Sequence, residues 1–203
     1  MLSMKPLFIF LVSSLYLFAN AQSEAIQEIE AYQISENEKF ANPETTILKK
    51  TDLDNFEELD FYPIDLNYRV EATFVRTPNE TPFLMKTSTS RLPEYVKYGE
   101  AHFSLFGKEL QLNLYQSTTP SEDPEYIDYL FLPFTDLTSG DGSYGGGRFL
   151  DAYIPKGDTI VLDFNKAYNP YCAYNTRYSC PIPPSENDLA IRIEAGVKDF
   201  GHH

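Results

Sequence analysis

The fold of this protein is decided by residues 101–115, which read Ala-His-Phe-Ser-Leu-Phe-Gly-Lys-Glu-Leu-Gln-Leu-Asn-Leu-Tyr. Hydrophobic and polar residues alternate on both sides of Gly107, so that each arm has one apolar and one polar face when it is extended. Glycine adopts a positive φ at little cost, which suits a tight turn at Phe106–Lys108. The stretch therefore predicts a β-hairpin with one buried face.

Five further segments have the composition of strands. They are residues 68–75, 129–134, 149–154, 159–164 and 188–195, and each is rich in β-branched, aromatic or leucine side chains. No long helical pattern separates them, so consecutive strands should pair directly. We predict a mainly β fold, an antiparallel β-sandwich or a small barrel, with a helical segment at the N-terminus.

The chain before this β-rich region is acidic and helical in pattern. Residues 22–65 carry a net charge of −9, out of −14 for the whole chain. The hydrophobic residues recur at helical spacing: Ala25, Ile29, Tyr32 and Phe40. We predict an amphipathic helix that ends before Pro43 and exposes its charged side to solvent. The resulting boundaries are an acidic helical segment over 22–55 and a β-rich domain over 56–203.

Residues 1–21 have the three regions of a secretory signal peptide. Lys5 supplies the positive charge, residues 7–17 form the apolar run, and Ala19-Asn-Ala21 provides the small residues that precede cleavage. The apolar run is short for a membrane-spanning helix, and acidic residues soon follow it. We therefore expect export to the periplasm or the medium, a mature chain that begins at Gln22, and no membrane association after cleavage.

The composition argues against several classes of partner. With 16 Lys+Arg against 30 Asp+Glu, the chain lacks the clustered positive charge that nucleic acids and anionic lipid surfaces require. Two cysteines and three histidines are few for a zinc cluster. The dinucleotide-like glycines at 140–145 lack the strand–helix context of that motif. We expect no metal and no cofactor, and the sequence leaves the oligomeric state open.

Two cysteines form the only pair that could bridge. In an exported protein Cys172 and Cys180 are expected to form a disulfide that holds a local loop. The alternative makes Cys172 a free nucleophile, which needs a nearby base to form its thiolate. His102 is the only histidine outside the C-terminal tail, and the strand alternation places it on a solvent-facing side.

A glycine-rich loop, residues 136–148, is the first part of the candidate site. Three consecutive glycines are costly to order unless the backbone approaches something closely. Beside them, Arg148 is a candidate clamp for a carboxylate or phosphate. The alternative is a flexible hairpin tip in which Arg148 pairs with Asp136 or Asp151.

A second loop, residues 163–187, mixes tyrosine and asparagine densely. That composition suits a cleft for a small polar molecule or a glycan, although tyrosines at helical spacing also serve packing. Together the two loops supply the candidate ligand-binding residues Tyr144, Gly145, Gly146, Gly147, Arg148, Asn165, Tyr168 and Asn169.

Four sequence blocks in and beside these loops resemble the bacterial "domain of unknown function 1684" family. They are Phe131-Leu-Pro-Phe-Thr-Asp136, Tyr144-Gly-Gly-Gly-Arg-Phe-Leu-Asp151, Asp163-Phe-Asn-Lys-Ala-Tyr-Asn-Pro-Tyr-Cys-Ala-Tyr174 and Ser179-Cys-Pro-Ile-Pro-Pro184. The resemblance extends from about Phe56 to Phe200. It implies one β-rich domain and brings no activity, catalytic residue or cofactor.

Two functional hypotheses follow from these residues. The first is an exported binding or interaction module whose two loops surround a small molecule or glycan. The second is an extracytoplasmic hydrolase of a polymer or ester, with carboxylates in the same cleft as acid and base. Its candidate catalytic residues are Asp136, Asp163 and Glu186.

Overall fold

The computed structural model describes residues 5–119 and 121–201, and the side chains of residues 21–119, 121–124 and 126–201. Part of the expected signal peptide, residues 1–4, lies outside the described residues. Helix α1 spans Lys5–Ala41 and α2 spans Lys50–Leu53. Short 3₁₀ helices lie at η1 Leu66–Tyr68, η2 Pro124–Tyr126, η3 Phe164–Lys166, η4 Tyr171–Ala173 and η5 Ser185–Asn187.

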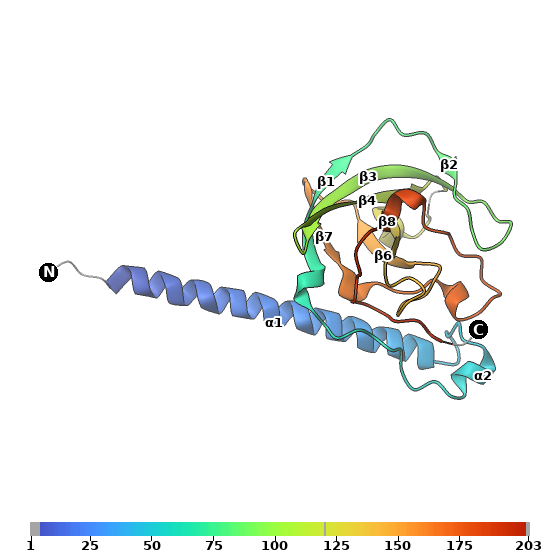
Figure 1. Ribbon diagram of the computed structural model, residues 1–203, viewed down its shortest axis with the longest axis horizontal. Coiled ribbons are helices and arrows are strands. Elements are labelled where there is room, and N and C mark those ends of the chain that lie inside the picture. Colours follow the sequence, from blue (N-terminus) through green and yellow to red (C-terminus); the bar gives the residue numbers. More distant parts are fainter. Residues whose placement is uncertain (1–4, 120, 202–203) are drawn as a thin grey trace.

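The strands form one curled, mostly antiparallel sheet, a half-barrel (Figure 1). In chain order they are β1 Arg69–Arg76, β2 Phe83–Leu84, β3 Glu94–Leu105, β4 Lys108–Ser117, β5 Tyr129–Asp136, β6 Arg148–Tyr153, β7 Thr159–Asp163 and β8 Asp188–Leu189. The spatial order is β6-β5-β4-β3-β1-β7; β2 pairs with β3, and β8 pairs with β5 in parallel. The predicted fold class is confirmed.

The hairpin predicted over residues 101–115 is formed by β3 and β4. Phe103 pairs with Leu110 and Leu105 with Lys108, which leaves a two-residue turn. Phe106 and Gly107 both have positive φ, 49° and 75°, as a two-residue turn that follows the twist of its strands requires. The alternation therefore predicted both the strands and the register.

Alternation along β4, β5 and β6 divides their side chains between two buried layers. The inner, concave face of the sheet carries the main core, which includes Leu112, Leu130, Leu132, Phe134 and Leu150. The outer face carries a smaller aromatic layer made by Met85, Tyr115, Phe131 and Phe149. Both faces of β5 and β6 are thus covered, and a charged residue on either strand has one of two very different surroundings.

The predicted strand at 188–195 forms only its first two residues. Beyond Leu189 the chain still alternates, and Ile191, Ile193 and Ala195 point into the main core. Its carbonyl oxygens at Ile193 and Ala195 accept hydrogen bonds from the Arg148 side chain instead of from a neighbouring strand. The segment is therefore extended and buried without being part of the sheet.

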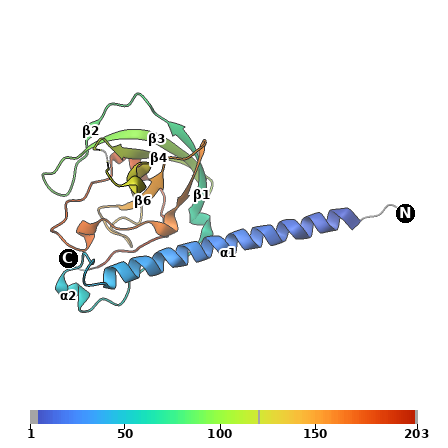
Figure 2. The same ribbon diagram turned by 180° about the vertical axis from the view of Figure 1, so that it is seen from behind.

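Helix α1 confirms the predicted N-terminal helix and its end before Pro43. Figures 1 and 2 show its first part projecting beyond the sheet and its later part lying along the domain. Ile29 and Phe40 are buried there, and Glu28 forms ion pairs with Arg69 and Lys166. The expectation of a fully solvated charged face is therefore wrong at Glu28, because basic residues of the β domain face it.

The expected cleavage point after Ala21 falls inside this helix, which runs on without interruption. Within the described residues, no helix combines the length and the apolar composition that crossing a membrane would require.

Candidate functional site

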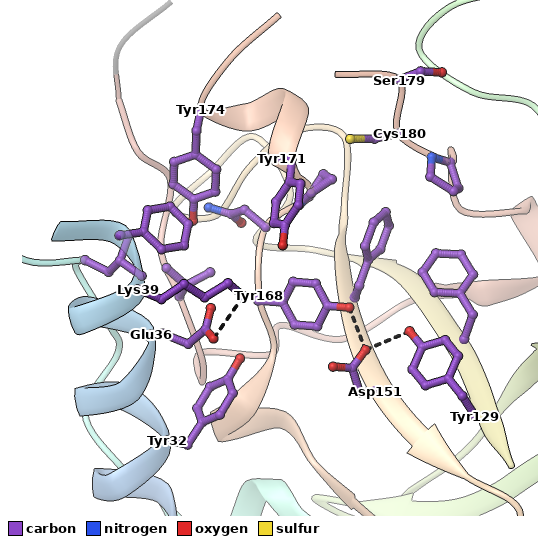
Figure 3. Close-up of a pocket in the computed structure, with 18 of the residues that line it drawn as sticks. Tyr32, Glu36, Lys39, Tyr129, Asp151, Tyr168, Tyr171, Tyr174, Ser179 and Cys180 are labelled. Atoms are coloured by element: carbon purple, nitrogen blue, oxygen red, sulfur yellow. Dashed lines mark hydrogen bonds and ion pairs between the residues drawn. The ribbon is translucent and has the colours of Figure 1, made fainter. Parts of the chain in front are cut away.

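A cavity of about 420 Å³ lies between α1, the outer face of β5 and β6, and residues 168–181 (Figure 3). We call it the tyrosine pocket, because its lining includes Tyr32, Tyr95, Tyr126, Tyr129, Tyr168, Tyr171 and Tyr174. Phenylalanines 61, 131 and 149 add apolar wall. Its size and its mixture of aromatic walls with few polar groups are typical of small-molecule sites.

Asp151 is the central polar group of the tyrosine pocket. The hydroxyls of Tyr129 and Tyr168 both donate to the same carboxylate oxygen, Oδ1, at 2.7 and 2.6 Å. Figure 3 shows the other oxygen, Oδ2, turned toward α1. No residue with a described side chain forms a hydrogen bond or an ion pair with Oδ2. The two tyrosines thus orient the carboxylate and leave one of its oxygens open.

Other charges in the tyrosine pocket already have partners. Lys39 Nζ lies 3.4 Å from Glu36 Oε1 and 5.8 Å from the ring centre of Tyr171. Arg91 donates from Nε and Nη2 to the hydroxyl and carbonyl oxygens of Ser179, at 3.2 and 2.8 Å. Lys39 and Glu36 therefore form an ion pair, whereas Asp151 and Arg91 have hydrogen bonds only to neutral groups among the described residues.

The phenols around Asp151 are poor bases and poor nucleophiles at neutral pH. Burial raises the pKa of Tyr129, and the adjacent Asp151 carboxylate raises it further. Burial likewise raises the pKa of Tyr168 well above its usual value, with contributions from Tyr129 and Asp151. Burial, together with Glu36 and Asp151, does the same for Tyr32. These side chains stay protonated, which suits binding and not proton abstraction.

Asn169, which lines the tyrosine pocket, has a buried acceptor without a partner. Its side chain is 2% exposed, and Nδ2 donates to the carbonyl oxygen of Lys198 at 2.9 Å. Its carbonyl oxygen Oδ1 is buried and has no hydrogen-bond partner. An unpaired buried acceptor is unfavourable, so it marks a place where a ligand or a water molecule would be stabilised.

A smaller cavity of about 330 Å³ adjoins the tyrosine pocket and shares Tyr32, Asp151 and Tyr168 with it. Its polar lining is an ion-pair network in which Arg69 meets Glu28 and Asp163, and Lys166 meets Glu28. Asp163, a predicted catalytic candidate, is thus occupied with Arg69, and it also accepts a hydrogen bond from the Asn165 backbone.

The predicted anion clamp, Arg148, faces the opposite side of the sheet. It is fully buried and pairs with Asp136 at 2.9 Å, and it donates to backbone carbonyls of Ile193, Ala195 and Val197. Asp136 in turn accepts from the backbone of Thr138 and Ile193. The clamp hypothesis is wrong, because no part of the guanidinium reaches solvent. The alternative, pairing with Asp136, is confirmed.

Close packing within the protein explains two of the three glycines, Gly146 and Gly147. A Cβ at Gly147, which has φ +86°, would lie 2.6 Å from the Phe134 carbonyl oxygen and 2.8 Å from Pro183. At Gly146 a Cβ would lie 2.5 Å from the Tyr144 ring. The glycine-rich loop and the tyrosine-rich loop do meet, since Gly147 lies against Pro183 and the Tyr144 hydroxyl lies 3.9 Å from Cys172 Sγ. Neither Tyr144 nor Gly145–Gly147 lines the tyrosine pocket.

The remaining predicted site residues divide between structure and site. Asn165 bonds the backbone of Asp65 through both its amide atoms and so fastens two loops. Glu186 is exposed near η5, and it does not line the tyrosine pocket. The candidate acids Asp136, Asp163 and Glu186 therefore do not share this cleft. Of the predicted ligand-binding residues, Tyr168 and Asn169 do line it.

The predicted disulfide is wrong, since Cys172 and Cys180 are free thiols. The Cys172 backbone N–H donates to Cys180 Sγ at 3.1 Å, and Cys180 lines the tyrosine pocket. A hydrogen bond from Cys180 lowers the pKa of Cys172 to about 6 in spite of burial, and the same contact raises the pKa of Cys180. The two cysteines are close in sequence and in contact in the structure, but no covalent bond joins their sulfurs.

His102 does not serve as a base for these thiols. It lies on β3 with its Nε2 3.0 Å from Glu100, its side chain is 42% exposed, and it does not line the tyrosine pocket. The solvent-facing position predicted from strand alternation is confirmed. Within the described residues, no group of three or more His, Cys, Asp or Glu side chains is arranged to hold a metal ion.

Several residues of the tyrosine pocket escaped prediction. Asp151 was considered only as a partner for Arg148, although alternation along 148–153 places the two on opposite faces. Tyr32, Glu36 and Lys39 of α1 belong to a segment expected to be solvated. The helical spacing of Tyr32 and Phe40 was the available signal, but nothing local identifies the surface on which such a face docks.

Comparison with known proteins gives a family and a structural relative. No curated protein matches this sequence. Among solved structures, an uncharacterised protein of Haloarcula marismortui, determined in solution by NMR, is 30% identical with a TM-score of 0.70. The match covers 90% of this chain and 99% of that one. The family model for the "protein of unknown function (DUF1684)" matches residues 54–198, so the chain belongs to the DUF1684 family.

Proposed function

We propose that this protein binds a small molecule, or one residue of a glycan, in the tyrosine pocket. The observation that carries the proposal is the pair of unused acceptors, Asp151 Oδ2 and Asn169 Oδ1, set in an aromatic cavity of about 420 Å³. Orienting a carboxylate with two tyrosines and then leaving one oxygen open is the pattern of a preorganised recognition group.

The hydrolase alternative has less support. Its three candidate acids do not share a cleft. Asp136 is paired with Arg148, Asp163 is paired with Arg69, and Glu186 is exposed in η5. The phenols of the tyrosine pocket are held protonated by burial. A binding function needs only the groups that are present, so it is the one we favour.

We further propose that the protein acts after export, with its leader removed behind Ala21. The charged, apolar and small-residue regions of residues 1–21 support this. Every residue of α1 that lines the tyrosine pocket follows Ala21, so cleavage would leave the pocket complete. Mass spectrometry of the exported protein should find a chain that begins at Gln22, and an intact leader would contradict export by this route.

Ligand screening tests the binding proposal. The whole chain would be screened against mixtures of polar metabolites and short oligosaccharides by thermal shift, and each hit would be mapped by hydrogen exchange. We expect hits to protect residues 32–40 and 168–181 and to weaken at least tenfold in Tyr32→Ala, since one buried aromatic contact is worth about that much.

Ile34→Ala is the matched control, because Ile34 lies on the same helix but is 59% exposed. It should leave the affinity of every hit unchanged. Hits that protect other regions, or that bind Tyr32→Ala as well as the wild type, would show that the tyrosine pocket is not the site.

A further inference from the structure

We infer that the ligand of the tyrosine pocket carries a protonated primary amine, with Asp151 as its counter-ion. This inference rests on the binding function proposed above and specifies the chemistry of the ligand. It follows from counting which hydrogen-bonding capacities around Asp151 the protein has already used and which it leaves open.

The hydroxyl hydrogens of the two tyrosines that hold Asp151 are used up. Tyr129 and Tyr168 each have one hydroxyl hydrogen, and both hydrogens go to Asp151 Oδ1. What these phenols can still offer a ligand is the lone pairs of their oxygens. Asp151 Oδ2 adds another acceptor, and the buried Asn169 Oδ1 adds one more within the same pocket.

A ligand group placed against Asp151 Oδ2 and the phenol oxygens of Tyr129 and Tyr168 meets acceptors there, so it must be a donor. An ammonium group has three N–H donors and no acceptor, so it leaves none of its own lone pairs unsatisfied there. A sugar hydroxyl donates one hydrogen and also needs a donor for its oxygen. Carboxylates and phosphates have no hydrogens to give at neutral pH, and Asp151 would repel them. The unused capacity therefore selects a cation with N–H groups.

The charges of the lining support the same conclusion. Lys39 is paired with Glu36, and Arg91 is held by Ser179, whereas no cationic side chain of the described residues contacts Asp151. A ligand ammonium group would supply the cation that Asp151 lacks. Binding would thus convert a lone carboxylate into a charge-assisted hydrogen-bonded pair.

The aromatic walls suit the rest of such a ligand. Ring faces attract cations, as the position of Lys39 Nζ 5.8 Å from the ring centre of Tyr171 already illustrates. Figure 3 shows Tyr32 reaching toward Asp151 from α1, opposite Tyr129 and Tyr168, so that rings approach the carboxylate from both sides. Phe131 and Phe149 provide apolar surface for a hydrocarbon or aromatic portion beyond the amine.

Three probes of one shape and different charge test the inference. They are 2-phenylethylamine, which is protonated at pH 7, the neutral 2-phenylethanol, and the anion phenylacetate. Binding to the whole chain would be measured by NMR titration at low salt. We expect the amine to bind at least about tenfold more tightly than the alcohol, and the anion to bind most weakly.

Asp151→Asn is the decisive variant, because it keeps the shape and an acceptor for the tyrosines while removing the charge. It should reduce amine affinity about tenfold and leave the alcohol unchanged. Asp158→Asn removes the same charge at an exposed position outside the tyrosine pocket and should change neither. Raising the salt concentration should weaken amine binding alone, since charge pairing is screened.

The outcomes separate this inference from the binding function. Equal binding of alcohol and amine, or an amine affinity indifferent to Asp151→Asn, would overturn the amine assignment and leave a binding pocket of another specificity. Failure of all three probes to bind would also overturn it. The binding function itself falls only if the metabolite screen finds no ligand that depends on Tyr32.

Discussion

Arg148 and Asp151 are three residues apart on β6, yet their side chains lie on opposite faces of the sheet. Arg148 faces the inner core, is fully buried, and is joined to Asp136 and to backbone carbonyls of the C-terminal segment. Asp151 faces outward into the tyrosine pocket, remains accessible to solvent, and has one oxygen without a partner. The odd spacing of three along a strand places them on different sides.

The comparison shows that a prominent charge is a poor guide to a binding site on its own. A buried charge is costly unless it is paired, and the two terminal nitrogens of the buried Arg148 are bonded to Asp136 and to backbone carbonyls, out of reach of any ligand. The less conspicuous aspartate keeps free capacity because it lies at a surface hollow. Accessibility is what separates the two faces, because Arg148 is fully buried and the open oxygen of Asp151 belongs to an exposed residue.

The largest expected effect comes from breaking the inner pair. Arg148→Met leaves the Asp136 carboxylate buried without its cation, which should cost about 3–5 kcal/mol of unfolding free energy in urea titrations. Adding Asp136→Leu removes the stranded charge and should recover part of that loss. Lys50→Met, in an exposed pair with Asp54, should leave the midpoint nearly unchanged. A loss no larger than that of Lys50→Met would refute the structural role of Arg148.

Gly147→Ala tests the loop that connects the two faces. The residue combines φ +86° with a 2.6 Å approach of the new Cβ to the Phe134 carbonyl oxygen, so we expect a loss of about 2–4 kcal/mol. Gly107→Ala has positive φ but open space and should lose only about 1 kcal/mol. Gly157 has neither a positive φ nor a close neighbour, so Gly157→Ala should leave the free energy of unfolding unchanged. Equal losses at all three would mean that close packing is not the reason for Gly147.

Cys172, the less buried of the two thiols, should react with alkylating reagents. Because Cys180 lowers the pKa of Cys172 to about 6, alkylation by iodoacetamide should rise through pH 6, and at pH 7 should be about tenfold faster than for an ordinary thiol. Cys180→Ala removes the hydrogen bond and should move the midpoint toward 9. Two thiols should titrate per unreduced, denatured chain; finding none would contradict the free pair.

Removing one of the tyrosine hydroxyls that donate to Asp151 should lower the free energy of unfolding by a smaller amount. Tyr168→Phe or Tyr129→Phe keeps the ring and deletes one hydrogen bond to Asp151 Oδ1, which should cost about 1 kcal/mol by urea unfolding. Tyr126→Phe, at an exposed tyrosine of the same pocket, is the control and should cost nothing measurable. If the double variant lost no more than the control, the two hydroxyls would not be holding Asp151.

The smallest effect concerns the contact that holds α1. A hydrogen bond from Lys166 lowers the pKa of Glu28, so this contact stabilises docking above the ordinary glutamate pKa and is lost as pH falls through the lowered value. The pair is half exposed, so the effect should be a few tenths of a kcal/mol.

Hydrogen exchange of α1 amides at pH 7 and pH 3.5 would measure this loosening of the helix. Glu28→Gln should lose the pH dependence, and Glu24→Gln, on the exposed part of the helix, should keep it. Docking of α1 that is equally tight at both pH values in the wild type would refute the contribution of Glu28.

Local patterns predicted the elements well for physical reasons. The β3–β4 hairpin and the end of α1 are decided by side-chain alternation, turn chemistry and the proline that follows, all of which act over a few residues. The strand over 190–195 was overpredicted because the alternation that signals an extended buried segment does not say where its backbone hydrogen bonds go. Here the carbonyl oxygens of Ile193 and Ala195 accept hydrogen bonds from the Arg148 side chain.

The candidate site was predicted only in part. Tyr168 and Asn169 were found because tyrosine and asparagine concentrate in one loop. Asp151, Tyr129 and the α1 residues were missed because their role depends on which surfaces meet, and segments more than a hundred residues apart close the tyrosine pocket. The cysteines were assigned a bond from spacing and an assumed oxidising compartment, neither of which determines sulfur geometry.

By itself, then, the amino-acid sequence determined a mainly β domain with an acidic N-terminal helix, since those depend on periodicities of two and 3.6 residues that every local window carries. Only the tertiary structure decided that Arg148 lies in the core and Asp151 lines the tyrosine pocket, that Glu28 and Tyr32 contact the β domain, and that the two cysteines are not bridged. Those outcomes depend on which faces are buried against one another, because burial decides whether a charged side chain meets a protein partner or stays accessible to a ligand.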